Sequence, residues 1–342
     1  MRLEFSKIKD ITLGAVRIEQ NENGISFYRF TKKQEEMYKN RSEDFYRKTF
    51  ATSGIRFRFR TNSTTLFLNA VIINKGSSRS YFSFDVFVNG ERIDSIDNFS
   101  GANLPPEYNT LSFPTGEFSK EFYLGTGEKE VCVYLPWSVS VVLKEIAVDD
   151  GAFIDPIKPG KKMLCFGDSI TQGYDALRPS NKYVSKLADV LDSEEYNKAI
   201  GGEIFYPDLA AAKEDFCPDY ITVAYGTNDW NRCESDVFAN NCKEFFNNLS
   251  VNYPNAKIFA ITPIWRKDMD LNKPFGEFKG VGEIIKSQVA KHQNIWVIDG
   301  FCFVPQNEKL YADLRLHPND KGFEFYFEGL VKAIKSISND YK

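Results

Sequence analysis

The chain has 342 residues and a mass of 39.2 kDa, which is enough for two domains. Hydrophobic residues make up 42% and charged residues 26% of it, as in an average globular protein, which excludes a disordered or fibrous chain. The 43 Lys and Arg against 47 Asp and Glu leave a net charge of −4 without any basic block. Neither nucleic acid nor an anionic membrane is therefore an expected partner.

Residues 1–150 carry the pattern of an all-β domain. Short apolar runs with an alternating pattern, such as IRFRFR at 55–60, are separated by turn signals such as NKGSS, NGER and GTGE. Strands of this length and spacing are typical of a β-sandwich or jelly roll, and a barrel is the alternative. We predict a β-sandwich over this half.

The pattern changes after residues 151–161, which hold two prolines and two glycines without apolar periodicity and are predicted to be a linker. From 162 to 342, short β-rich runs alternate with helical stretches, which predicts a doubly wound, mainly parallel sheet. The expected strands are 162–168, 194–200, 219–226, 256–263 and 294–299, and the expected helices are 181–191, 234–250, 277–291 and 320–337. Ligands of such sheets bind at the carboxyl ends of the strands, so polar residues there are the candidates for a site.

Histidine and cysteine limit the possible chemistry. The only two histidines are His292 and His317, and no HExxH pattern occurs, so a histidine-based zinc site is not expected. The six cysteines form no CxxC pair and several lie in apolar runs, which favours free, buried thiols over disulfides.

The amino-terminal sequence MRLEFSKIKD lacks the apolar stretch of a signal peptide. No run of 18 apolar residues occurs elsewhere. We therefore expect a soluble, cytoplasmic protein.

Ser169 is the candidate nucleophile. It follows the first strand of the second half in FGDSITQGY, where a hydroxyl would meet the first N–H groups of a helix. A helix N-cap is the alternative role for a serine at this place. The nucleophile elbow G-x-S-x-G is absent, because Thr171 stands at its second glycine, and this disfavours an α/β-hydrolase fold.

Two later strand ends supply possible hydrogen-bond donors. Gly201 and Gly202 follow the second strand in NKAIGGEIF, and Asn228 follows the third in VAYGTNDW. Glycines there could serve only a tight turn, and the asparagine could form an Asx-turn or a cap. A nucleophile, a backbone donor and an amide donor at three successive strand ends nevertheless match acyl transfer, which requires donors for a developing oxyanion.

His317 is the candidate base. It lies in YADLRLHPND before the last predicted helix, with Asp313 four residues upstream. A lone histidine often has only a structural role. His292 falls in a polar helical run, VAKHQN, which leaves His317 as the only histidine near a strand end.

Four blocks, in this order, resemble the SGNH hydrolases, also called GDSL esterases. GDSITQG resembles the block of the nucleophile, here Ser169, and NKAIGG resembles the block of the backbone oxyanion donor, here Gly202. GTND resembles the block of the amide donor, here Asn228, and LHPND that of the base, here His317. The resemblance covers residues 162 to about 335 and implies a flavodoxin-like α/β sheet. It also implies a serine esterase without metal or organic cofactor, in which the nucleophile's own N–H is a further oxyanion donor.

The last block departs from the family. The family usually places its aspartate three residues before the histidine, where this chain has Leu314, whereas Asp313 lies four residues before His317. Asp313 completes a catalytic triad if the loop lets it reach the imidazole. A Ser-His dyad with a backbone carbonyl orienting the ring is the alternative.

The β-rich first half extends the resemblance to family-two carbohydrate esterases, in which a jelly-roll domain precedes the SGNH domain. This implies an O-acetylated carbohydrate as the substrate, such as an imported xylo- or manno-oligosaccharide. Aromatic residues border the acetyl pocket in that family, and Trp230 and Trp265 are the candidates here, although either could lie in the core. Asp168, directly before the nucleophile, completes the candidate substrate-binding residues.

Two other functions fit the same blocks. A lipase or thioesterase would use them on longer acyl chains, which require an apolar groove. A non-catalytic carbohydrate-binding protein would keep the β-sandwich beside an inactive SGNH domain, but all four blocks keep their reactive residues.

Overall fold

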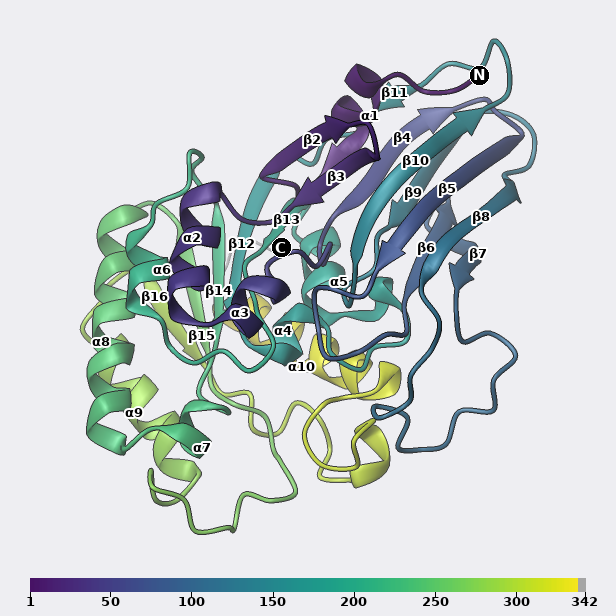
Figure 1. Ribbon diagram of the computed structural model, residues 1–342. Helices are drawn as coiled ribbons and strands as arrows, with labels where there is room; N and C mark the ends of the chain where they lie inside the picture. The colour runs from purple at the N-terminus through teal and green to yellow at the C-terminus, as the bar shows by residue number, and fades with distance from the viewer. Residues whose placement is uncertain (338–342) are drawn as a thin grey trace.

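The computed structural model describes residues 1–337, which form two antiparallel sheets and one parallel sheet with its flanking helices (Figure 1). The chain builds the antiparallel sheets first and the parallel sheet second. The sequence-based prediction of a β-rich half followed by a doubly wound α/β half is therefore confirmed. The proposed boundaries at 150 and 161 remain predictions.

The two antiparallel sheets pack face to face. One contains β1 (Thr12–Leu13), β4 (Arg56–Thr61), β9 (Lys129–Tyr134), β6 (Ser83–Val88) and β7 (Glu91–Asp97), in that order, with β11 (Asp155–Pro156) paired to β4. The other contains β2 (Arg17–Asn21), β3 (Gly24–Tyr28), β10 (Ser140–Val148), β5 (Thr65–Ile73) and β8 (Gly116–Tyr123). Phe59 of β4 and Leu68 of β5 are completely buried in one shared core, as in a β-sandwich. The jelly-roll connectivity remains a prediction.

Three helices in this half were not predicted by the alternating pattern. They are α1 (Phe5–Ile11), α2 (Lys32–Arg41) and α3 (Glu43–Lys48). Thr31 begins α2 with a capping box to Gln34, and the Ser42 hydroxyl accepts the Phe45 N–H to begin α3. The all-β interpretation is wrong for this segment, because local capping signals in a polar run outweigh the surrounding β pattern.

Helices α2 and α3 belong in space to the second half of the molecule. Figure 1 shows them in purple beside α6 (Pro207–Ala211) and the parallel sheet. Phe30 and Tyr38 are both 0% exposed and lie in the core cluster of that sheet. The first half therefore covers apolar surface of the second.

The parallel sheet has the order β13-β12-β14-β15-β16. Its strands are β12 (Lys161–Gly167), β13 (Ser193–Asn197), β14 (Tyr220–Ala224), β15 (Lys257–Ile261) and β16 (Ile295–Ile298). The larger helices are α5 (Tyr183–Val190), α8 (Ser235–Asn252), α9 (Lys279–Val289) and α10 (Asp320–Ile337), and short helical turns are α4 (Ser169–Gln172), α7 (Asp229–Arg232), η1 (Pro179–Asn181) and η2 (Glu308–Leu310). Every predicted strand and helix of this half overlaps an observed one.

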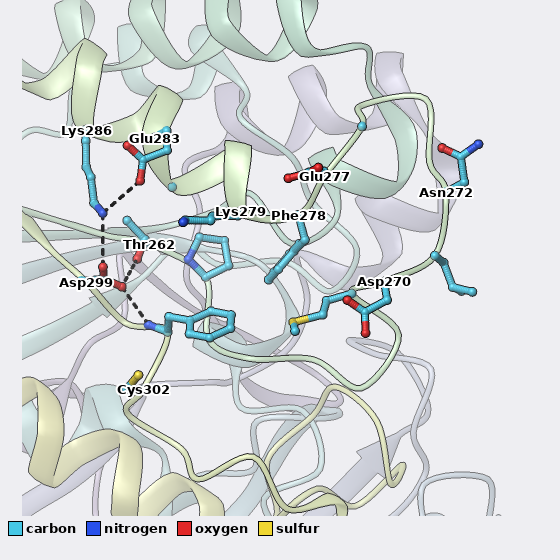
Figure 2. Close-up of a pocket in the computed structure, with 16 residues that line it drawn as sticks. Thr262, Asp270, Asn272, Glu277, Phe278, Lys279, Glu283, Lys286, Asp299 and Cys302 are labelled. Atoms are coloured by element: carbon cyan, nitrogen blue, oxygen red, sulfur yellow. Dashed lines mark hydrogen bonds and ion pairs between the residues drawn. The ribbon is translucent and has the colours of Figure 1, made fainter.

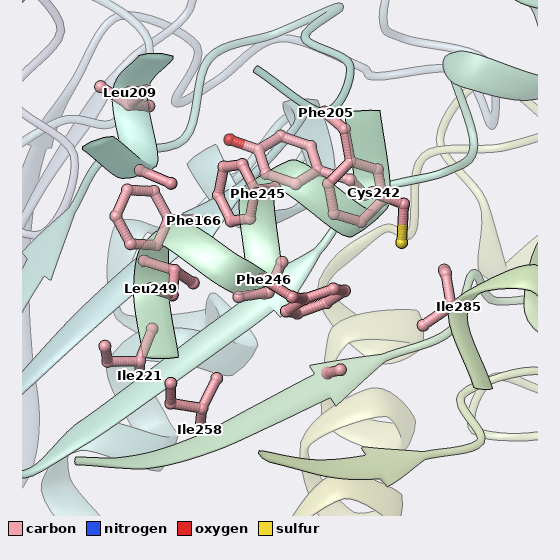
Figure 3. Close-up of a cluster of buried hydrophobic side chains, with 14 of the residues drawn as sticks. Phe166, Phe205, Leu209, Ile221, Cys242, Phe245, Phe246, Leu249, Ile258 and Ile285 are labelled. Atoms are coloured by element: carbon pink, nitrogen blue, oxygen red, sulfur yellow. The ribbon is translucent and has the colours of Figure 1, made fainter. Parts of the chain in front are cut away.

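Neighbouring residues of β12 point to opposite faces of the sheet and enter two separate cores. Leu164 and Phe166 join the core under α6, α8 and α9, part of which Figure 3 shows. Met163 and Cys165 join the core under α5 and α10. Burial on both faces explains why this strand reads as an uninterrupted apolar run.

A buried guanidinium ties the two halves together. Arg29, 1% exposed, donates to the carbonyls of Ala51 and Lys48 in the first half and of Asn197 and Ala199 in the second. Burial lowers the pKa of Arg29 to about 9. The two halves are thus joined here by a polar contact that is completely buried.

The segment predicted as a linker also packs on the first half. Ile154 is buried, and β11 pairs with β4 through Asp155 opposite Arg60 and Pro156 opposite Phe59. Such docking leaves little freedom between the halves.

The six cysteines are free, as predicted, but Cys217 and Cys302 are exposed and only the other four are buried. Cys217 lies in the loop before β14, and Cys302 lies in the loop after β16. Among residues 1–337, no helix is long and apolar enough to cross a membrane.

We expect a fragment of residues 161–342 to aggregate, because it would expose the apolar surface that Phe30 and Tyr38 cover. Size-exclusion chromatography of the fragment beside the full chain measures this. A monodisperse fragment with a cooperative thermal transition would contradict the expectation.

Candidate active site

Ser169 lies at the carboxyl end of β12 as the first residue of α4. The N-cap of α4 is Asp168, whose carboxylate accepts the Ile170 N–H at 3.0 Å. The capping role considered for Ser169 therefore falls to its neighbour. A side chain at Gly167 would meet Thr171 Oγ1 at 2.2 Å, so this turn requires a glycine before the aspartate.

The hydroxyl of Ser169 contacts the imidazole of His317, although the two residues are 148 positions apart. Ser169 Oγ lies 2.8 Å from His317 Nε2, and His317 Nδ1 lies 2.8 Å from Asp313 Oδ2. The structure thus brings the predicted nucleophile, base and acid into one hydrogen-bonded chain.

The protonation states follow from the partners of Asp313. Burial alone would raise the pKa of Asp313, but His317 and the N–H groups of Leu316 and His317 outweigh it and hold this pKa well below its usual value. An ionised carboxylate only accepts, so Nδ1 carries the proton and Nε2 accepts from the Ser169 hydroxyl. This is the tautomer that a general base requires.

The extra residue between aspartate and histidine is absorbed by a left-handed turn. Leu314 has φ 51°, in a region that non-glycine residues seldom adopt. Asp313 Oδ1 accepts the N–H groups of Arg315, Leu316 and His317, which closes the loop around its carboxylate. Asp313 consequently reaches the imidazole from four positions upstream.

Gly202 and Asn228 lie together at the next two strand ends. Asn228 Nδ2 donates to the carbonyl of Glu203 at 3.0 Å, which ties the loop after β14 to the loop after β13. Gly202 has φ 86°, and a Cβ there would lie 3.3 Å from Arg232 Nη2 and 3.7 Å from Phe45 Cε1. Within residues 1–337 no acceptor takes the Gly202 N–H. This N–H is therefore available to a ligand.

The three candidate substrate-binding residues have different surroundings. Asp168 is 2% exposed and its carboxylate caps α4, and its contact with the substrate remains a prediction. Trp230 is 0% exposed, and its Nε1 donates to the Gly276 carbonyl, so it takes the core role that the sequence left open. Trp265 is half-buried beside Tyr311, with ring centroids 5.4 Å apart, and lies near the loop that carries His317.

Two further residues at the imidazole were not found from the sequence. Tyr174 stacks on His317, with ring centroids 5.7 Å apart and planes at 28°. Asp175 Oδ2 lies 3.5 Å from His317 Nδ1. Both follow the GDSITQG block, but nothing in the spacing of GYDA indicates that the chain turns back to the histidine.

A separate cavity of about 870 Å³ opens near the carboxyl ends of β15 and β16 (Figure 2). Phe278 and Phe301 line it, and Lys286 pairs with Glu283 and Asp299 at its edge. Its lining residues include neither Ser169 nor His317. It is therefore not the place where the hydroxyl and imidazole meet.

Residues 165–325 match the model of the GDSL-like Lipase/Acylhydrolase family. The chain carries a GDSL-like lipase/acylhydrolase domain. This match spans the segment from Ser169 to His317, and it indicates a carboxylic ester hydrolase. No curated protein matches the chain.

Solved structures share the fold over nearly the whole length. A salicylyl-acyltransferase from a tetracycline biosynthetic pathway is 19% identical with a TM-score of 0.79, over 95% of this chain and 94% of the other. A family two carbohydrate esterase from Clostridium thermocellum is 14% identical with a TM-score of 0.66, over 95% and 98%. An acetyl xylan esterase from Butyrivibrio proteoclasticus is 14% identical with a TM-score of 0.65, over 100% and 99%. The likeness includes the β-rich half, so the arrangement of both halves recurs.

We expect Asp313→Asn to lower kcat for p-nitrophenyl acetate by about a hundredfold or more, because an amide favours the wrong imidazole tautomer. His317→Ala, measured in parallel, gives the kcat that remains when the base is removed. A decrease within about tenfold, worth about 1.4 kcal/mol, would instead indicate a dyad.

Proposed function

We propose that this protein is a serine esterase that removes O-acetyl groups from carbohydrate. The observation that carries the proposal is the chain from Ser169 through His317 to Asp313 within an acylhydrolase domain. The likeness of the whole chain to carbohydrate esterases, β-rich half included, supports the class of substrate.

In the proposed mechanism, His317 Nε2 takes the proton of the Ser169 hydroxyl as Oγ attacks the acetyl carbonyl carbon. The N–H groups of Ser169 and Gly202 and the Asn228 amide donate to the oxyanion of the tetrahedral intermediate. His317 then returns the proton to the departing sugar oxygen, which leaves an acetyl group on Ser169. A water molecule, deprotonated by His317, attacks this ester, and His317 returns the proton to Ser169 Oγ as acetate leaves.

Asp313 keeps the imidazole oriented throughout this cycle. Its Oδ2 accepts from Nδ1, while its Oδ1 is held by three backbone N–H groups of the same loop. The carboxylate therefore faces the imidazolium that forms in each transition state without having to move.

Two side chains flank Gly202, the proposed oxyanion donor. The Arg232 guanidinium donates to the Gly202 carbonyl at 2.6 Å, and the Phe45 ring lies on the same side of Gly202. These two side chains limit the room next to the glycine.

We expect Ser169→Ala to abolish acetate release while the fold is kept, because the covalent route loses its nucleophile. The measurement uses acetylated xylo-, manno- and gluco-oligosaccharides, with p-nitrophenyl acetate and p-nitrophenyl octanoate as simple substrates. Circular dichroism of the variant is the control for folding.

The other functions give different results in the same assays. Faster turnover of octanoate than of acetate would favour a lipase or thioesterase. Binding of oligosaccharides without hydrolysis of any acetyl ester would favour a carbohydrate-binding protein. Wild-type turnover by pure Ser169→Ala would contradict the proposed mechanism.

A further inference from the structure

A second carboxylate faces the imidazole of His317. Asp175 is 0% exposed, has φ 70°, and places Oδ2 3.5 Å from His317 Nδ1. The Nδ1 proton is already directed at Asp313, whose Oδ2 is closer at 2.8 Å. Asp175 therefore contributes a nearby charge to the imidazole and no hydrogen bond of its own.

Asp175 is held by the β-rich half. Arg79 Nε donates to its Oδ1 at 2.6 Å and Arg79 Nη2 to its Oδ2 at 3.0 Å, and the Tyr81 hydroxyl also donates to Oδ1. The Tyr108 hydroxyl donates to the Asp175 backbone carbonyl at 2.6 Å. Three donors from the β-rich half thus hold the Asp175 carboxylate near the base of the other half, and a fourth holds the Asp175 backbone.

Arg79 is also coupled to the ring that covers the base. Its guanidinium lies 5.2 Å from the centroid of Tyr174, and Tyr174 stacks on His317. Burial would lower the pKa of Arg79, but its bonds to Asp175 raise this pKa above the usual value. The guanidinium therefore remains a permanent positive charge behind Asp175.

We propose that Asp175 is a positioning residue whose carboxylate stabilises the His317 imidazolium from a second side. Arg79 partly neutralises this carboxylate and so limits how strongly it stabilises the imidazolium. The inference rests on the proposed function of His317 as the base. An anionic group near a cation favours the charged form, and a cation behind that group weakens the effect. The β-rich half would then tune the chemistry of the site.

The test is a titration of the His317 imidazole by NMR in the full chain. The protein has only two histidines, so the His292 signal is an internal reference in each spectrum. The groups that face His317 are Asp313, Asp175, Ser169 and Tyr174, with Asp168 also close enough to interact by charge. Changing Asp175 keeps the other facing groups, whereas changing Arg79 keeps them but also removes the guanidinium beside the Tyr174 ring.

We expect Asp175→Asn to move the titration midpoint of His317 to lower pH by about 0.5 to 1 unit, since an anion is lost. Arg79→Gln should move it to higher pH, since the carboxylate is no longer neutralised. The acid limb of the kcat/KM profile should shift in the same two directions. A merely structural role would not give opposite shifts.

Arg178→Gln is the matched control. Arg178 also joins the two halves, through an ion pair with Asp97 at 2.8 Å, but it does not touch His317. The titration midpoint of His317 in this variant should equal that in the wild type. Unmoved midpoints in both test variants, or shifts in one direction only, would overturn the proposal. The NMR measurement requires no turnover, so failure of the esterase assay alone counts against the proposed function instead.

A different contact carries a second inference, at the proposed oxyanion donor. The Lys48 ammonium on α3 donates to the Gly201 carbonyl at 3.0 Å, in a buried position. This carbonyl and the Gly202 N–H belong to one peptide group. The Gly201 N–H in turn donates to Gln172 Oε1 at 2.8 Å. The peptide is thus fixed at its carbonyl end, while its N–H has no acceptor among the described residues.

We infer that Lys48 positions and polarises this peptide so that Gly202 N–H is a stronger donor to the oxyanion. A cation on a carbonyl oxygen strengthens the hydrogen bond that the N–H of the same peptide can give. This effect matters most where negative charge develops, so it should affect kcat more than KM. The inference also rests on the proposed function.

We expect Lys48→Met to lower kcat about tenfold with little change in KM, and Lys48→Arg to restore part of it. The affinity for phenylboronic acid, which forms a tetrahedral adduct with a serine hydroxyl, should fall by a similar factor. Arg47→Met is the control, because Arg47 lies on the same helix and, like Lys48, pairs with Asp44, but it donates to the Ser77 carbonyl and not to that of Gly201. Equal kcat in Lys48→Met and Arg47→Met would overturn the inference. Failure of wild-type protein to bind the boronic acid would count against the proposed function.

Discussion

The structure depends on backbone carbonyls at the end of β13 and in the loop that follows it, whose hydrogen-bond donors come from the other half of the molecule. Arg29 donates to the carbonyls of Asn197 and Ala199, and Lys48 donates to that of Gly201. A buried carbonyl without a donor is costly, so the loop has its observed course only while the first half is docked. This loop carries the proposed oxyanion donor, and the docking of the β-rich half is therefore a condition for the site.

The periodic parts of the fold could be predicted from the sequence. Strands buried on both faces, such as β12, read as apolar runs, and helices such as α8 and α10 show the helical repeat. Helices α2 and α3 could not be predicted in the same way, because their polar sequence has little periodicity and they are stabilised by capping and by burial of Tyr38 against the other half. Local pattern does not report which distant surface a helix will cover.

The residues of the candidate site also fall into those that the sequence predicts and those that it does not. Ser169, Gly202, Asn228 and His317 could be found because each stands at a strand end in a recognisable block. The contact between Asp313 and His317 could not be predicted, since it depends on the left-handed backbone conformation of Leu314. Asp175 and Arg79 meet across 96 positions, and only the packing of the two halves brings them together. Residues that act through another residue leave no spacing signal of their own.

Acidic side chains near the site differ in charge because their donors differ. Burial raises the pKa of Asp168 to about 6 and that of Asp229 to about 7, since the few N–H groups that they accept do not offset the loss of water. Asp313 is also largely buried, yet the imidazole and several N–H groups hold its pKa below the usual value. The fold thus keeps the Asp313 carboxylate firmly ionised at His317, while burial moves two other acidic neighbours, Asp168 and Asp229, toward neutrality. This difference in pKa comes from the hydrogen-bond donors, which the Asp313 loop provides from its own backbone N–H groups.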